Sequence, residues 1–261
     1  MTRYVSPGFL RGAAGVVACA IIWEAFARSG MFSQALTPPI ALIATRLYEM
    51  AVNGTLWINA GYTMGRVAFG MAVAFAIAVP LGLLMARSRF AERFFLPLVS
   101  VLLPIPSLAW VPLFTLWFGI GDTATIAVVV YAASFPLIYN VWAGVRAVNP
   151  LWVRAAKVMG AGQWALFRNV MWPGALPYII TGARLALGRA WIGVIGGELL
   201  ASPRYGLGQM IFNAKEFLNA GVMLAVLLVI GIIGLLFERF VFHTLEERTT
   251  RKWGMTAGAR S

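Results

Sequence analysis

Three ionisable side chains interrupt the otherwise apolar residues 177–201: Arg184, Arg189 and Glu198. Charged groups inside a long apolar helix are costly, and they usually face a water-filled cavity or a partner. At about 100° per residue, Arg184 and Glu198 share a helix face while Arg189 points well away from it. We therefore expect no ion pair within this helix. Arg189 can bind an anion or can donate to carbonyl groups at helix ends, and both interpretations are open.

Residues suited to catalysis, metal binding or nucleotide binding are scarce elsewhere. His243 is the sole histidine and Cys19 the sole cysteine, too few for a His or Cys metal cluster or a disulfide. The sequence has no Gly-x-x-x-x-Gly-Lys-Ser/Thr motif, which is the loop that cradles nucleotide phosphates. The sequence thus predicts no catalytic residue, no metal and no cofactor on this chain.

Residues 149–177 match two sequence patterns of other protein classes, a dinucleotide-binding turn and a helix-turn-helix, without the context that either one needs. Gly160, Gly162 and Ala165 match the Gly-x-Gly-x-x-Ala of a dinucleotide-binding turn, but a predicted helix and no strand precedes them. The same segment mimics a helix-turn-helix, yet the flanking apolar runs leave no residues for a soluble three-helix domain. We expect neither a dinucleotide nor a nucleic acid as a ligand.

The composition is that of an integral membrane protein. Hydrophobic residues make up 61% of the chain and charged residues 11%, against roughly 25% charged in soluble domains. A helix needs about 20 apolar residues to cross the hydrocarbon core. Six runs qualify, which predicts an all-α fold with six transmembrane helices: 12–30, 60–86, 94–118, 122–144, 177–201 and 219–242.

The net charge of +12 follows from where the basic residues lie along the chain. With the N-terminus inside, most of them fall on the cytoplasmic side, as the positive-inside rule requires. These are Arg3, Arg11, Arg87, Arg89, Arg93, Arg146, Arg154, Lys157, Arg168, Arg239, Arg248, Arg251 and Lys252. Mainly Arg28, Arg46, Arg204 and Lys215 remain outside. Both termini are predicted to be cytoplasmic.

Residues 149–177 form a polar, basic segment between the fourth and fifth runs. Asn149 can cap a helix that starts at Pro150, and Gly160 can end it in a left-handed conformation. A second short helix is predicted from Gln163 to Met171, closed by Trp172 and Pro173. The segment is predicted to be a cytoplasmic surface that contacts another protein.

The same segment resembles the EAA loop of bacterial ABC-importer permeases. Arg154, Ala155, Ala156, Gly160, Val170 and Pro173 follow the family's spacing, with Arg154 where the family has Glu and Trp172 where it has Leu. Residues 103–122, with Leu-Pro-Ile-Pro, Ala-Trp-Val-Pro-Leu and Trp-Phe-Gly-Ile-Gly-Asp, resemble the nitrate, sulfonate and taurine branch. The resemblance extends from about Thr55 to His243.

The resemblance implies a type I ABC-importer permease fold with a cytoplasmic coupling helix in the bacterial inner membrane. It also implies two cytoplasmic ATPase subunits that bind ATP and Mg²⁺, a second and identical permease copy, an extracytoplasmic solute-binding protein and surrounding lipid. A rival interpretation is an ATP-independent secondary transporter, which should show an internal repeat and intramembrane acids. The solute stays open among nitrate, taurine, alkanesulfonates, aromatic acids and vitamin precursors.

The implied domain organisation has three parts. Residues 1–54 would hold the first span and an amphipathic helix at the outer interface, predicted over 37–53 from Ile40, Ile43, Leu47 and Met50. Residues 55–245 would form the permease core, with the coupling loop at 145–176, and residues 246–261 a cytoplasmic tail. The ATPase-docking residues would be Leu151, Arg154, Ala155, Ala156, Lys157, Val158, Met159, Gly160 and Pro173.

Residues of the translocation pathway are predicted from charge and from prolines. We expect Arg189 and Glu198 to face it, together with Pro104 and Pro106, which kink the third span into a cavity-lining shape. Arg66 is expected to extend to the outer headgroups. Five small residues of the fifth span are expected to pack against the second subunit. They are Gly182, Gly188, Gly193, Gly196 and Gly197.

Overall fold

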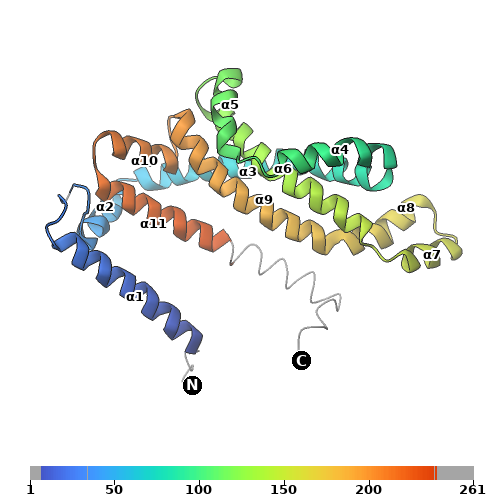
Figure 1. The fold of residues 1–261 in the computed structure, drawn as a ribbon, viewed down its shortest axis with the longest axis horizontal. Helices are drawn as coiled ribbons and strands as arrows, with labels where there is room; N and C mark the ends of the chain where they lie inside the picture. Colours follow the sequence, from blue (N-terminus) through green and yellow to red (C-terminus); the bar gives the residue numbers. More distant parts are fainter. Residues whose placement is uncertain (1–6, 34, 238, 240–261) are drawn as a thin grey trace.

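The computed structural model describes residues 7–33, 35–237 and 239, and this part of the chain is built from helices without strands (Figure 1). Its helices are α1 (Pro7–Arg28), α2 (Ile40–Val52), α3 (Thr55–Arg87), α4 (Arg89–Leu102), η1 (Ser107–Trp110), α5 (Val111–Phe118), α6 (Asp122–Arg146), α7 (Pro150–Val158), α8 (Gln163–Leu166), η2 (Phe167–Met171), α9 (Trp172–Ala201), α10 (Leu207–Glu216) and α11 (Ala220–Leu236). His243 and the predicted tail 246–261 lie outside the described residues.

Helices α3, α6 and α9 form the centre of the molecule, with α6 packed between the other two. Small residues let them approach closely. A Cβ at Gly182 of α9 would lie 2.5 Å from the Cβ of Asn140 on α6, and one at Gly82 of α3 would lie 2.7 Å from the Cβ of Val141. The buried cluster between these helices includes Met85, Leu137 and Val194. These closely packed helices also carry ionisable residues within their apolar stretches: Arg66 on α3 and Arg184, Arg189 and Glu198 on α9.

Three helices of the described chain are long and apolar enough to cross a membrane: α3, α6 and the helix that runs from Gln163 to Ala201. A fourth span is present if α4 and the η1–α5 pair, which meet at 94°, count as one broken span. Helix α11 has only 17 described residues. Helix α1 is not among the three helices above, and α11 is short, so the first and last of the six predicted spans stay a prediction.

The third apolar run does more than kink, because it breaks into two helices. Pro106 has no N–H, so the carbonyl of Leu102 lacks its helical donor. The hydroxyl of Tyr131 on α6 donates to this carbonyl at 2.9 Å. The guanidinium of Arg189 donates to the next carbonyl, that of Leu103, at 2.8 Å. Two side chains from neighbouring helices thus donate to carbonyls at the break, where Leu102 O also accepts from the Ile105 N–H at 3.3 Å.

The prediction that Trp172 and Pro173 close the short helix after Gly160 was wrong. The helix continues from Gln163 to Ala201 over 39 residues. A proline inside an α-helix loses one hydrogen bond and clashes with the carbonyl four residues earlier. Here the π turn η2 ends at Met171, two residues before Pro173, and the Trp172 N–H donates to the carbonyl of Phe167, five residues earlier. The wider turn accommodates the proline.

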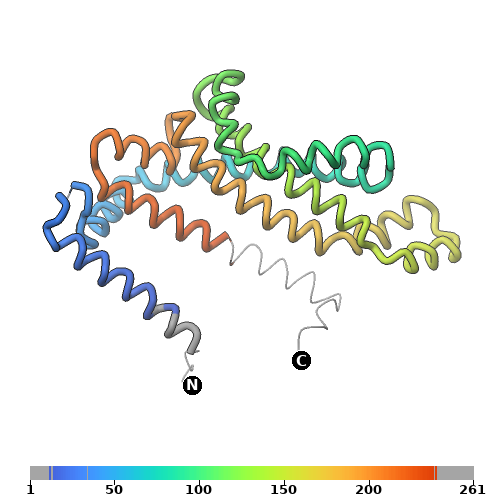
Figure 2. Tube along the Cα trace, viewed as in Figure 1, coloured from blue at the N-terminus to red at the C-terminus, as the bar shows by residue number. Residues whose placement is uncertain are grey.

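A second group of helices, α2, α10 and α11, packs together beside the start of α3 and encloses Ile43, Met50, Leu207 and Val226. The predicted amphipathic helix is present as α2, with Ile43 and Met50 on its buried face. Helix α10 was not predicted. Figure 2 shows this group at the opposite end of the molecule from α7 and α8.

Candidate functional site

Helix α7 has the ends that its sequence predicts. The Asn149 side chain accepts a hydrogen bond from the Leu151 N–H at 2.9 Å, and Pro150 occupies the first turn. At the other end Gly160 has φ +80°, while the Gly160 N–H donates to Lys157 O and the Ala161 N–H to Ala156 O, both at 3.0 Å. These are the two bonds of a Schellman motif. The helix and its turn are confirmed.

Most of the exposed residues of α7, together with Met159 directly after it, form an apolar and basic patch, which we call the docking surface. The exposed fractions of Leu151, Val158 and Met159 are 66%, 88% and 80%. The docking surface consists of Leu151, Arg154, Ala155, Lys157, Val158 and Met159, all exposed. Figure 1 shows α7 and α8 projecting together from one end of the molecule. Such large apolar side chains at a projecting tip are typical of a protein contact.

Three of the predicted docking residues have other positions. Ala156 is buried, with an exposed fraction of 6%, so its side chain packs within the protein and is not presented to a partner. Pro173 is half-buried in the first turn of α9. Gly160 shapes the turn and presents no side chain. In contrast Trp164 of α8, which was not predicted, is 70% exposed and extends the apolar surface next to α7.

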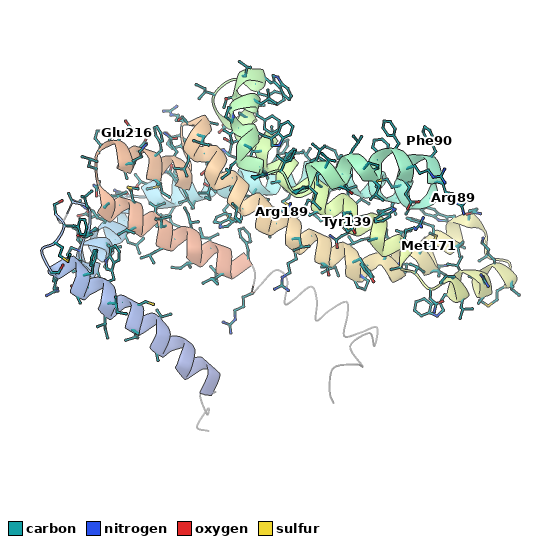
Figure 3. All side chains as sticks on the ribbon, viewed as in Figure 1. Arg89, Phe90, Tyr139, Met171, Arg189 and Glu216 are labelled. Atoms are coloured by element: carbon teal, nitrogen blue, oxygen red, sulfur yellow. The ribbon has the colours of Figure 1, made fainter. Side chains whose placement is uncertain are left out.

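A pocket at the broken span, which we call the bend pocket, brings together three of the four predicted pathway residues. Pro104 and Pro106 come from the break and Arg189 from α9, with Tyr131 and Phe135 of α6 on the opposite wall. The pocket has a volume of about 240 Å³. Figure 3 shows Arg189 in the middle of the molecule, far from Met171 at the docking end. Among the described residues, Arg189 donates one hydrogen bond, to Leu103 O, which leaves its other N–H groups for a ligand within this part of the chain.

Glu198 does not line the bend pocket, and the prediction that it faces the pathway is corrected here. Its side chain is completely buried. The carboxylate accepts from the Thr63 hydroxyl at 2.8 Å, from the Arg66 guanidinium at 2.5 Å and from the Gly208 N–H at 2.8 Å. A buried carboxylate is retained when it is paired and hydrogen-bonded in this way. Glu198 therefore joins α9 to α3 and α10.

Arg66 does not extend to headgroups, contrary to the prediction. Its side chain is only 4% exposed and bridges Glu198 to Asp122, at the start of α6, with an N–O distance of 2.6 Å to the latter. A further N–H donates to the carbonyl of Tyr205 at 2.6 Å. We call Thr63, Arg66, Asp122 and Glu198 the Glu198 network. It ties the three central helices together at one end.

The Glu198 network and Asn59 together supply the cap of α10. The first N–H groups of a helix have no partner within it. Here the Gly206 N–H donates to Asn59 at 2.7 Å, the Leu207 N–H to Thr63 at 2.9 Å and the Gly208 N–H to Glu198 at 2.8 Å. A carboxylate at a helix N-terminus is also favoured by the helix dipole.

Four of the five glycines assigned to packing against a second subunit pack within the chain instead. A Cβ at Gly182, Gly193, Gly196 or Gly197 would meet Asn140, Ala132, Leu108 or Thr125 within 3.3 Å. Only at Gly188, among these five, would a Cβ meet nothing within 4 Å. Gly188 lies in a surface pocket with Arg184, Arg189 and Trp191. Four of these glycines therefore let α9 pack closely within the chain, whereas Gly188 faces open space.

The described chain has helices of membrane-spanning length, the exposed pair α7–α8 at one end and a broken span beside Arg189. This is the arrangement expected of a membrane permease. The family described as binding-protein-dependent transport system inner membrane component matches residues 78–249. This chain belongs to that family, and it is a membrane-embedded component of ABC transport with the type I permease fold. The resemblance drawn from the EAA loop is confirmed.

Curated relatives cover most of the chain. The taurine transport system permease protein TauC of Escherichia coli (strain K12) is 34% identical over 234 residues, 88% of this chain and 84% of that protein. The bicarbonate transport system permease protein CmpB of Synechococcus elongatus is 32% identical and covers 90% and 87% respectively. The nitrate import permease protein NrtB of Synechocystis is 29% identical, covering 90% and 88%.

The inward-facing MetNI methionine ABC transporter has a chain of similar structure. Its TM-score is 0.61 at 22% identity, and the match covers 77% of this chain and 95% of that one. At this identity the likeness concerns the fold alone.

Proposed function

We propose that this chain is the membrane-spanning subunit of an ATP-driven importer for a small solute that carries an oxyanion group. The observation that carries the proposal is the docking surface, a capped helix of exposed apolar and basic residues at one projecting end. The substrates named in the relatives' descriptions are taurine, bicarbonate and nitrate, which carry a sulfonate, a carbonate or a nitrate group. Arg189 in the bend pocket suits such a group.

The proposed orientation places the docking end in the cytoplasm, with both termini on the same side. Arg87, Arg89 and Arg146 lie at the ends of α3, α4 and α6 that gather there, and Arg154 and Arg168 lie within α7 and η2 at the same end (Figure 1). The positive-inside rule supports this assignment. The Glu198 network and α10 then lie at the outer end.

The proposed partners are two ATPase subunits, a second copy of this chain and a solute-binding protein, with lipid around the spans. ATP and Mg²⁺ would be bound by the ATPase, because this sequence has no phosphate-binding loop. In the proposed mechanism of alternating access, closure of the ATPase dimer moves α7. The continuous helix from Gln163 to Ala201 carries that movement to Arg189.

Co-purification with the candidate ATPase tests the docking surface, and we expect Gly160→Leu to lose the ATPase. At φ +80° a leucine costs about 1–2 kcal/mol of backbone strain, which reorients α7 relative to α8. Gly162→Leu is the matched control, since Gly162 has an ordinary φ of −67° and open space around it. Retention of the ATPase by Gly160→Leu would contradict the assignment of this turn to docking. If the wild type holds no ATPase and the chain alone moves solute in liposomes, the chain is a secondary transporter.

Uptake by the reconstituted importer tests Arg189. A hydrogen bond from a charged group is worth about 1.5–3 kcal/mol, so Arg189→Gln should reduce uptake by roughly 10- to 100-fold. Assembly and ATPase activity should persist, and Arg189→Lys, which keeps the charge, should recover part of the uptake. If Arg189→Gln fails to assemble, its bond to Leu103 O is its main role and the pathway assignment fails.

A further inference from the structure

A second pocket, which we call the basic pocket, lies between the start of α4 and the end of α6. Its volume is about 520 Å³, and six residues line it: Arg89, Glu92, Arg93, Leu96, Pro97 and Arg146. Figure 3 shows Arg89 at the same end of the molecule as Met171, which is the docking end. The basic pocket is separate from the docking surface and from the bend pocket, and the proposed transport mechanism leaves it without a use.

The charges in the basic pocket are unbalanced. Arg146 pairs with Glu92 at 2.8 Å, and this pair holds α6 against α4. Within the described part of the chain, Arg89 and Arg93 have no carboxylate within ion-pair distance. Three arginines therefore face one carboxylate, and two guanidinium groups are left to bind an anion. Guanidinium groups suit phosphate because they donate two parallel hydrogen bonds to its oxygens.

An apolar stripe runs along α4 beside the basic pocket. Phe90, Phe94 and Leu98 are spaced four residues apart, so they share one helix face, and they are 81%, 56% and 48% exposed. The rings of Phe90 and Phe94 stack with centroids 6.5 Å apart. Leu96 and Pro97 add apolar surface inside the pocket. An anion bound here would contact the arginine guanidinium groups and would lie next to the apolar side chains of the stripe.

We propose that the basic pocket binds the phosphate headgroup of an anionic phospholipid, whose acyl chains lie along Phe90, Phe94 and Leu98. Basic pockets between membrane helices on the cytoplasmic side are suited to such headgroups. A free phosphate would use the arginines but gain nothing from the apolar stripe. The inference rests on the proposed orientation of the importer, which places the docking end at the cytoplasmic surface.

The position of the basic pocket gives the bound lipid a structural consequence. Arg146 is the last residue of α6, and Asn149, the cap of α7, follows three residues later. A headgroup held by Arg89, Arg93 and Arg146 would fix the end of α6 against α4. The docking helix would then start from a better-defined position.

Native mass spectrometry of the importer complex tests the proposal. The complex is extracted from nanodiscs of phosphatidylcholine with phosphatidylglycerol or cardiolipin, and retained lipids are counted. We expect the wild type to retain the anionic lipid with about a tenfold preference and Arg89→Gln/Arg93→Gln to lose that preference. Arg87→Gln/Arg168→Gln removes the same charge at the same end but outside the basic pocket, and it should retain the lipid.

Four results would overturn the proposal. Equal loss of lipid by both double variants would mean attraction to charge alone. A rise of the thermal midpoint with inorganic phosphate in detergent, with no further rise from anionic lipid, would assign the basic pocket to a free anion. Loss of the ATPase by Arg89→Gln/Arg93→Gln with unchanged lipid retention would assign it to a protein contact. If lipid preference is absent while the ATPase still co-purifies, this inference fails and the proposed function stands.

Discussion

Replacing Arg66 by leucine is expected to prevent most of the chain from accumulating as folded protein in the membrane. The substitution leaves Glu198 completely buried without its cation, and breaking a buried ion pair in this way costs about 3–5 kcal/mol. It also removes the donors to Asp122 and to the Tyr205 carbonyl. The measurement is the monodisperse yield and thermal midpoint of a fluorescent fusion in detergent.

Arg46→Leu is the matched control for Arg66→Leu. Arg46 pairs with Glu49 on α2, where the two side chains are 40% and 49% exposed, and pairs this accessible to water contribute about 0–1 kcal/mol. The double variant Arg66→Leu/Glu198→Leu removes both buried charges and should recover part of the lost stability. A wild-type midpoint for Arg66→Leu would mean that the Glu198 network does not hold the central helices together.

Gly182→Val is expected to disrupt the packing of α9 on α6, with an overpacking cost of about 1–3 kcal/mol or more. A Cβ at this position would lie 2.5 Å from the Cβ of Asn140, which is closer than two such carbons approach, and both helices are held by other neighbours. The thermal midpoint of the purified chain measures the loss.

Gly188→Val on the same helix serves as the matched comparison. A Cβ there meets nothing within 4 Å, so the single chain should keep its thermal midpoint. If the second copy of the permease packs on this side of α9, Gly188→Val should instead weaken the dimer in native mass spectrometry. Equal destabilisation of the isolated chain by both variants would contradict the assignment of these two glycines.

Local signals explain why the coupling loop could be predicted in detail. The Asn149 cap, Pro150 in the first turn and Gly160 at a positive φ each depend on a few neighbouring residues. The same holds for the prolines that break the third run. The helix end at Pro173 was predicted wrongly because a π turn is not signalled by any residue type, although it allows a proline to follow inside the helix.

The Glu198 network could not be predicted from one helix at a time. Removing the charges of Arg66, Asp122 and Glu198 from water is offset only when the three segments that carry them, which are far apart in sequence, meet. A signal was nevertheless present. In the predicted six-span topology, Arg66, Asp122 and Glu198 all lie near the outer ends of their spans, so opposite charges at the same depth could have been paired. The docking surface, which lies within one segment, needed no such pairing.

The unbroken helix from Gln163 to Ala201 has a thermodynamic consequence. If the importer couples its two ends as proposed, the coupling free energy belongs to both, because linkage between binding sites is reciprocal. A solute that binds more tightly at Arg189 when the ATPase is attached must raise the affinity for the ATPase by the same factor. An affinity titration of the ATPase, with and without solute, would therefore measure at the docking end what occurs in the middle of the membrane.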